Sequence, residues 1–240
     1  MKNKRTRVKI CGITRVADGL AASDAGADAI GLVFWGGTPR VVDVGRAREI
    51  ADALPPFVTI VGLFVDPQAS DVRAILDAVP LDLLQFHGTE TPDLCRALGR
   101  PYLKAIHMKD GVDLLEYAAL YDDAAGLLFD SYWPGDLPGG TGRAFDWSRL
   151  SGAVQGKLPA PVILSGGLDP ANVGEAIRAV RPWAVDVSSG VEERGPDGNV
   201  RKGIKDAARI AAFVAAVRNT DAATEVAHAD GRSPERVRPA

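Results

Sequence analysis

The 240-residue sequence has few cysteines and few histidines, and this scarcity argues against several kinds of site. Its two cysteines, Cys11 and Cys95, are too few for a disulfide framework, so a reducing, cytoplasmic compartment is expected. The three histidines, His87, His107 and His228, have no spacing that suits zinc ligands. We therefore expect neither disulfides nor a bound metal.

The sequence also lacks long apolar runs and blocks of one charge. No apolar run reaches the roughly 18 residues that a membrane helix needs, and no signal-peptide pattern precedes Val8. Lysines and arginines are scattered, and the formal net charge of -3 provides no basic surface for nucleic acid. These absences predict a soluble globular protein that binds neither membrane nor nucleic acid.

What is present is a regular alternation of short apolar runs with amphipathic helical stretches. A doubly wound sheet would alternate in the same way, but eight strand-and-helix units of roughly 25–30 residues each predict a single (β/α)8 TIM barrel. The predicted strands cover residues 8–12, 29–34, 57–64, 81–86, 102–106, 126–129, 161–164 and 183–187. The predicted helices cover residues 15–25, 43–54, 67–79, 91–98, 110–120, 172–180 and 203–217.

No change of composition interrupts this series, so residues 1–218 are predicted to form one catalytic domain. Residues 219–240 lack a strong apolar period and are expected to be a flexible tail, with a short helix over 222–229 as the alternative. Thr14 is expected to cap the first helix, and Gly26 to end it. Thr91 and Pro92 have the order typical of a helix start.

In such a barrel the active site lies at the carboxyl ends of the strands. Cys11 ends the first predicted strand directly before Gly12, which favours an accessible thiol over a buried small hydrophobe. Asp130 ends the sixth, where a half-buried setting can raise the pKa of its carboxyl; a carboxylate that only caps the loop is the alternative. Together they form an acid and base pair for moving protons on a sugar.

Glycine-rich turns follow the last two strands. Gly166 and Gly167 come after the seventh, and Ser189 and Gly190 after the eighth, where barrels expose backbone N–H groups to a phosphate. A single such turn is weak support, but the pair favours a phosphate site. The loop over residues 138–142 is interpreted as a mobile cover over the sugar.

A lysine on the fifth strand raises a different function. Lys104 would suit a Schiff-base aldolase if its side chain pointed into the barrel. Its neighbours along the strand alternate, so its side chain can equally point outward at a helix, and the aldolase is the less favoured function.

Several motifs in order now point to one family. VKICGIT, FWGGTPR, LLQFHG, GGTGRAFDW, LSGGLDPANV and VDVSSGVE make the chain resemble the phosphoribosylanthranilate isomerases of tryptophan biosynthesis, from Val8 to about Val217. The resemblance implies an Amadori rearrangement of N-(5-phosphoribosyl)anthranilate without cofactor or metal, by a monomer or homodimer. It also implies that Cys11 is the general base and Asp130 the general acid, and that Arg40 pairs with the anthranilate carboxylate. His87 and Asp186 would line the site, and the phosphate would be held by Gly166, Gly167, Ser189 and Gly190.

Two alternatives remain at this stage. A histidine-pathway or dual-pathway isomerase would carry an aspartate where Cys11 stands, and a second glycine-rich phosphate site that residues 65–68 do not provide. A non-catalytic phosphate-binding barrel would need neither Cys11 nor Asp130. Both alternatives are therefore less favoured than the phosphoribosylanthranilate isomerase.

Overall fold

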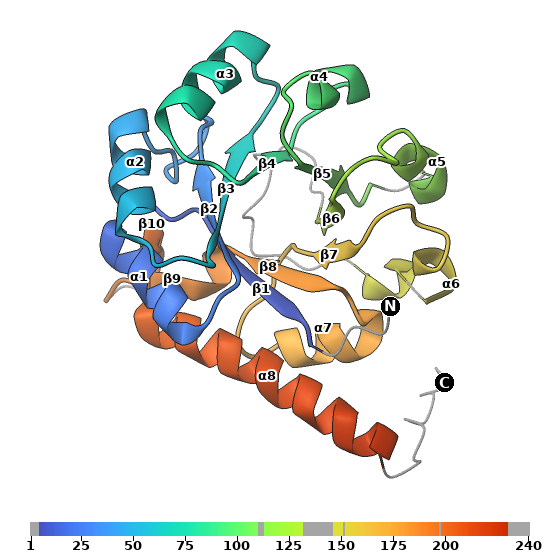
Figure 1. The fold of residues 1–240 in the computed structure, drawn as a ribbon. Coiled ribbons are helices and arrows are strands. Elements are labelled where there is room, and N and C mark those ends of the chain that lie inside the picture. Colours follow the sequence, from blue (N-terminus) through green and yellow to red (C-terminus); the bar gives the residue numbers. More distant parts are fainter. Residues whose placement is uncertain (1–4, 110–112, 132–145, 151, 197, 230–240) are drawn as a thin grey trace.

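The computed structural model describes residues 5–109, 113–131, 146–150, 152–196 and 198–229. Eight parallel strands form a closed barrel in chain order, with β1 paired to β8, so the predicted barrel is confirmed and the doubly wound sheet is wrong (Figure 1). The strands are β1 Arg7–Cys11, β2 Ala29–Val33, β3 Thr59–Phe64, β4 Leu83–Phe86, β5 Tyr102–His107, β6 Gly126–Asp130, β7 Val162–Leu164 and β8 Ala184–Val187.

Helices surround the barrel on its outer side (Figure 1). They are α1 Val16–Ala25, α2 Val44–Ala53, α3 Ala69–Ala78, α4 Pro92–Arg96, α5 Leu114–Ala119, α6 Gly152–Gln155, α7 Val173–Val180 and α8 Ala207–Ala229. The 3-10 helix η1 Trp147–Leu150 precedes α6, and η2 Ser189–Val191 follows β8. An antiparallel hairpin of β9 Glu192–Arg194 and β10 Val200–Lys205 lies between η2 and α8.

The predicted helix ends are partly correct. Gly26 ends α1 in the left-handed region at φ 89°, and the Thr91 hydroxyl accepts a hydrogen bond from the Leu94 amide at 3.3 Å, as expected. The expected cap at Thr14 is wrong, because α1 begins at Val16 and the Thr14 hydroxyl donates to the carbonyl of Gly203 instead.

The last helix differs from the prediction at both ends. It begins at Ala207 rather than near Gly203, because residues 200–205 pair with β9. It runs to Ala229 rather than ending near Val217, so the start of the expected flexible tail is helical, and the alternative helix over 222–229 is the end of α8. Residues 230–240 lie outside the described part of the chain, and the domain boundary at 218 stays a prediction.

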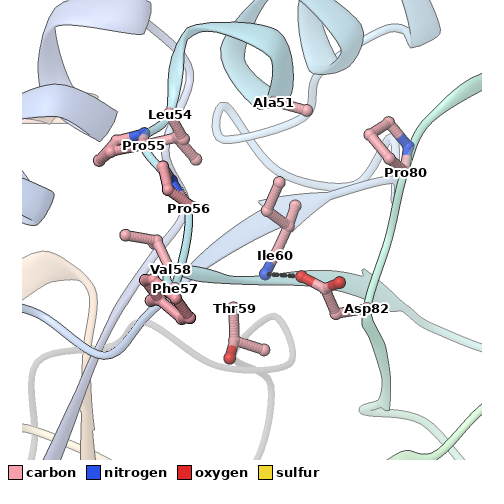
Figure 2. A pocket seen from close by; sticks show the side chains of 10 residues that line it. All are labelled: Ala51, Leu54, Pro55, Pro56, Phe57, Val58, Thr59, Ile60, Pro80 and Asp82. Carbon is pink, nitrogen blue, oxygen red and sulfur yellow. Dashed lines mark hydrogen bonds between the residues drawn. The ribbon is translucent and has the colours of Figure 1, made fainter.

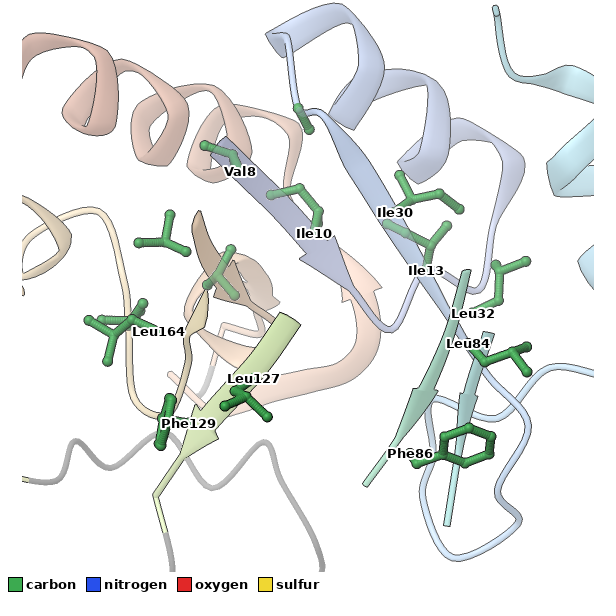
Figure 3. Close-up of a cluster of buried hydrophobic side chains, with 14 of the residues drawn as sticks. Val8, Ile10, Ile13, Ile30, Leu32, Leu84, Phe86, Leu127, Phe129 and Leu164 are labelled. Atoms are coloured by element: carbon green, nitrogen blue, oxygen red, sulfur yellow. The ribbon is translucent and has the colours of Figure 1, made fainter. Parts of the chain in front are cut away.

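The main hydrophobic core lies between the barrel and its helices. Alternate residues of each strand point outward into it, and each buried branched or aromatic side chain contributes roughly 1.5–3 kcal/mol (Figure 3). This layer includes Val8, Ile10, Ile30, Leu32, Leu84, Phe86, Leu127, Phe129 and Leu164. A smaller cluster of Leu103, Ala105, Leu128, Ile163 and Ala184 fills the inside of the barrel toward the amino ends of the strands.

The two ends of the barrel therefore differ. At the amino ends of the strands a hollow between α2 and β3 is lined by residues 54–60, with a fully exposed Phe57 and a hydrogen bond from the Ile60 amide to Asp82 at 2.8 Å (Figure 2). None of the predicted catalytic residues lies there. At the carboxyl ends several inward side chains are polar, among them Gln85, Asp130 and Asp186. No helix among the described residues is long and apolar enough to cross a membrane.

Candidate active site

A pocket opens at the carboxyl ends of the strands, as the barrel predicts. It brings together the five side chains that the sequence analysis assigned to catalysis and to the substrate's sugar and anthranilate parts. Its lining comprises Cys11, Val33, Trp35, Thr38, Arg40, Leu63, Gln85, His87, Asp130, Ser165, Asp186 and Ser188. Six of the eight strands contribute a lining residue, so residues far apart in the sequence meet in one cavity.

Asp130 is the last residue of β6, and its carboxylate is only 3% exposed. Oδ1 accepts the backbone N–H of Ser131 at 2.8 Å, and Oδ2 lies 3.1 Å from His87 Nε2. The other ring nitrogen of His87, Nδ1, lies 3.0 Å from Gln85 Nε2. An amide nitrogen can only donate, so with this amide orientation His87 carries its proton on Nε2 and donates it to Asp130.

Cys11 ends β1 and points into the same pocket, 6% exposed. Lys9, two residues earlier, shares its inward face, and Lys9 Nζ pairs with Asp186 Oδ1 at 2.8 Å across the seam where β1 meets β8. A Cβ atom added to Gly31 would lie 2.8 Å from Cys11 Sγ and 3.2 Å from Lys9 Nζ, so thiol and ammonium converge above this glycine.

The charges around Cys11 act in opposite directions. Burial raises the pKa of the Cys11 thiol above its usual value, and the carboxylate of Asp186 raises it further. The ammonium groups of Lys9 and Lys205 lower it, but burial has the larger effect. Lys9 itself has a raised pKa, because Asp186 and Cys11 outweigh the effect of its own burial. Burial thus disfavours ionisation of the Cys11 thiol, and the Lys9 ammonium beside it opposes this effect.

The four residues predicted to hold a phosphate lie in two adjacent loops. Gly166 and Gly167 follow β7 at φ 82° and 67°, and a Cβ on Gly166 would lie 2.5 Å from the Ser131 amide nitrogen. Their backbone N–H groups form no hydrogen bond with any other residue that the structure describes. Ser189 and Gly190 form η2 directly after β8.

Side chains that do not line the pocket hold these two loops in place by hydrogen bonds. Asn172 Nδ2 donates to the Gly167 carbonyl at 2.8 Å, and Arg209 donates to the Gly190 carbonyl through Nη2 at 2.8 Å and Nε at 3.2 Å. The loops are thus held in place without using the Gly166 and Gly167 amides, which suits an anion site.

Arg40 enters the pocket from the loop after β2, but its guanidinium already has a partner. Nε and Nη2 donate to the two carboxylate oxygens of Glu192 at 2.7 and 2.8 Å, in a buried ion pair. Sequence reasoning missed Glu192, together with Lys9, Gln85 and Lys205. Two of these had a usable signal, because Lys9 and Gln85 stand two positions before Cys11 and His87 and so share their inward face.

Lys104 lies outside this pocket. Its ammonium pairs with Glu90 Oε2 at 2.8 Å and donates to the Gly88 carbonyl at 2.7 Å. The side chains of Lys104 and Glu90 are both fully buried. Of the two orientations that the sequence left open, the structure has the outward one, and the Schiff-base aldolase is wrong because no free amine reaches the pocket from this position.

The sequence matches the family model of N-(5'phosphoribosyl)anthranilate (PRA) isomerase over residues 8–216. The chain belongs to the PRA isomerase family. The PRA isomerase of Pseudomonas aeruginosa is 59% identical over 213 residues, which cover 89% of this chain and 95% of that protein.

Solved PRA isomerase structures agree with this assignment. The crystal structure of the PRA isomerase from Thermotoga maritima is 37% identical with a TM-score of 0.79, over 89% of this chain and 99% of that one. A second PRA isomerase crystal structure, in complex with reduced 1-(o-carboxyphenylamino)-1-deoxyribulose 5-phosphate, is 35% identical with a TM-score of 0.76 over the same shares. The predicted resemblance to PRA isomerases is confirmed.

Proposed function

We propose that Asp130 and Cys11 are the general acid and general base of this chain, an N-(5'-phosphoribosyl)anthranilate isomerase of tryptophan biosynthesis. The observation that carries the proposal is that both groups, from β6 and β1, line one buried pocket at the carboxyl end of the barrel. One acid and one base suffice, because the rearrangement only moves protons within a single substrate molecule.

The first step opens the sugar ring. Protonated Asp130 gives its proton to the ring oxygen as the C1–O bond breaks, and the lone pair of the anilino nitrogen forms a C1=N iminium. Asp130 is then a carboxylate, stabilised by the His87 Nε2 proton at 3.1 Å and the Ser131 amide at 2.8 Å.

The second step removes the proton from C2. Cys11 takes it as a thiolate, after its thiol has released a proton to water beside the Lys9 ammonium, and the C–H electron pair forms the C1=C2 bond of an enolamine while the iminium nitrogen is neutralised. Tautomerisation then releases the C2 hydroxyl proton to water and adds the proton held by Cys11 to C1, which leaves C2 as the ketone, so C2 is oxidised and C1 is reduced. The electrons balance within the substrate, and no redox cofactor or metal is required.

The substrate's two anionic ends match two parts of the site. The phosphate would lie on the amides of Gly166, Gly167, Ser189 and Gly190, and the anthranilate carboxylate on Arg40. The related isomerase captured with reduced 1-(o-carboxyphenylamino)-1-deoxyribulose 5-phosphate supports this, because that ligand carries both groups. Val33, Leu63 and Trp35 provide an apolar wall for the aromatic ring.

We place the enzyme in the cytoplasm, as its two unpaired cysteines suggest. A monomer or a homodimer stays a prediction. So does the cover formed by residues 138–142, which lie outside the described residues.

The test is isomerisation measured with Cys11→Ser and Asp130→Asn. Each is expected to lower kcat by about 10²–10⁴-fold, the usual contribution of a positioned acid or base. Both variants should still bind the reduced product analogue, since the phosphate and carboxylate contacts are intact. Cys95→Ser is the matched control and should keep wild-type kcat, because Cys95 lies on α4 outside the pocket. Near-full activity of Asp130→Asn would overturn the acid assignment.

A further inference from the structure

The guanidinium of Arg40 is hydrogen-bonded along only one of its edges. Its Nε and Nη2 face Glu192, and Nη1 forms no hydrogen bond with any residue that the structure describes. The aliphatic part of its side chain packs on Gly12, where an added Cβ would lie 2.6 Å from Arg40 Cδ. The guanidinium is thus fixed between the turn after Cys11 and Glu192, with one nitrogen left for a ligand in the pocket that it lines.

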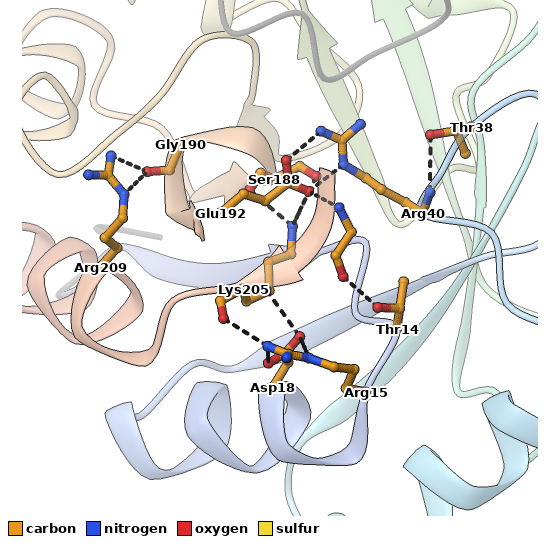
Figure 4. A network of polar contacts seen from close by, with 11 residues as sticks. Thr14, Arg15, Asp18, Thr38, Arg40, Ser188, Gly190, Glu192, Lys205 and Arg209 are labelled. Atoms are coloured by element: carbon orange, nitrogen blue, oxygen red, sulfur yellow. Dashed lines mark hydrogen bonds and ion pairs between the residues drawn. The ribbon is translucent and has the colours of Figure 1, made fainter. Parts of the chain in front are cut away.

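Glu192 is itself fixed from the opposite side, as Figure 4 shows. Its Oε1 accepts the Gly203 amide at 2.8 Å and lies 3.3 Å from Lys205 Nζ, both from β10. The Thr14 hydroxyl and the Asp18 carboxylate hold β10 to the region of α1, through the Gly203 carbonyl and the Lys205 amide. Contacts on both sides of β10 therefore join the Glu192 carboxylate to the region of α1.

The charges of this group do not cancel. Arg40 and Lys205 are two buried basic groups, and Glu192 is the one carboxylate between them; burial lowers the pKa of Lys205, the ion pair with Glu192 opposes this, and Arg40 lowers it further. The pKa of Glu192 lies below its usual value although burial raises it, because Arg40 and Lys205 favour the charged form, so Glu192 is an anion at neutral pH. One positive charge remains, and an anion that enters the pocket meets it at Arg40.

We propose that Glu192 is a positioning residue that turns Arg40 Nη1 toward the carboxylate of the substrate and so makes the enzyme select a carboxylated aryl amine. The inference rests on the proposed role of Arg40. Lys205 keeps the group net positive, so the pairing with Glu192 orients Arg40 without removing its attraction for an anion. An arginine on a flexible side chain would otherwise lose rotational freedom each time it bound the substrate.

The experiment compares kcat/KM for two substrates, N-(5'-phosphoribosyl)anthranilate and N-(5'-phosphoribosyl)aniline, which lacks only the carboxylate. The ratio of the two values measures carboxylate selection and cancels any difference in the fraction of folded enzyme. Arg40→Met tests the proposed role of Arg40. Glu192→Asp keeps the charge but shortens the side chain, and Glu192→Gln with Lys205→Met keeps the net charge but removes the support. Glu193→Gln, on the half-exposed neighbouring residue that pairs with Arg201 rather than with Arg40, is the control.

We expect wild type and Glu193→Gln to prefer the carboxylated substrate, and Arg40→Met to lose that preference by roughly ten- to a hundredfold. Glu192→Asp and the charge-balanced double variant should lose most of it as well, through a higher KM for the carboxylated substrate and an unchanged KM for the aniline. If Arg40→Met loses the preference and both Glu192 variants keep it, the role of Glu192 is wrong and that of Arg40 stands. If Arg40→Met keeps the preference, both are wrong.

Discussion

His87 Nε2 lies 3.1 Å from Asp130 Oδ2, so the proposed acid has a hydrogen-bond donor aimed at the charge that it develops when it gives up its proton. Gln85, fully buried behind the imidazole, has its amide nitrogen 3.0 Å from His87 Nδ1, and this amide orientation requires the ring tautomer that donates from Nε2, while it leaves Gln85 Oε1 without a partner among the described residues. Gln85 thus acts on Asp130 through the orientation and tautomer of one histidine.

Replacing His87 by leucine should therefore lower kcat by roughly ten- to a hundredfold, since one preorganised donor is lost. KM should change little, because His87 is assigned to neither the phosphate nor the carboxylate. Steady-state kinetics check this. His107→Gln is the control, since an amide can keep the hydrogen bond to the His87 carbonyl. An unchanged kcat in His87→Leu would show that Asp130 works without this donor.

The pH dependence of Cys11 should respond to Lys9. Burial and Asp186 raise the pKa of the Cys11 thiol and the Lys9 ammonium lowers it, so Lys9→Met should move that pKa upward. In a Cys95→Ser background, where Cys11 is the one remaining thiol, the midpoint of iodoacetamide alkylation against pH measures it. The acid limb of kcat/KM should shift in the same direction.

The control for this shift is the double variant Lys9→Met with Asp186→Asn. It removes both members of the ion pair, and hence both opposing effects, so its midpoint should lie closer to wild type than that of Lys9→Met alone. A midpoint that Lys9→Met leaves unmoved would contradict the proposed stabilisation of the thiolate by Lys9.

The barrel, and the meeting of Cys11 and Asp130 in one pocket, were predictable because both follow from local pattern. Apolar runs that end in a polar residue mark strand ends, and barrel geometry brings such ends together, which is how Cys11 and Asp130 could be paired. Lys9 and Gln85 were missed because the strand-end rule points only to the last residues of each strand. Strand alternation also turns the residue two positions earlier toward the inside of the barrel.

Glu192 and Lys205 could not be assigned from local pattern. Residues 192–205 have no apolar alternation, and the hairpin there depends on partners far along the chain: Arg40, Thr14 and Asp18. A long-range charge pairing leaves no periodic signal in one sequence. The end of α8 was missed for a related reason, since a weakly periodic segment continues a helix that is already formed.

Cys95 should make stability fall at alkaline pH. Burial raises the pKa of its thiol to about 12 in the folded chain, against about 8.5 when unfolded. Between these values the folded state binds more protons, so this contribution is complete below pH ~8.5 and is lost as pH rises toward 12. Urea unfolding at pH 7.5 and 10 should show that Cys95→Ala loses less stability over this interval than wild type, by about 1–2 kcal/mol. Equal losses in the two proteins would contradict the raised pKa.

The ion pair of Lys104 with Glu90 should matter for stability and not for chemistry. Both side chains are fully buried, and Glu90 also accepts the amides of Gly88 and Asp66, so it anchors the loop after His87. Lys104→Met leaves a buried carboxylate unpaired and should cost roughly 3–5 kcal/mol of unfolding free energy.

The double variant Lys104→Met with Glu90→Gln removes the unpaired charge and should recover part of that loss, which urea unfolding of the full mutant cycle would measure. The folded fraction of each variant should keep its kcat, because Lys104 points away from the pocket. Breaking the half-exposed pair of Arg48 and Asp52 by Arg48→Gln is the control and should leave stability almost unchanged. If the double variant is no more stable than Lys104→Met, the loss of unfolding free energy comes from packing rather than from the unpaired Glu90 carboxylate.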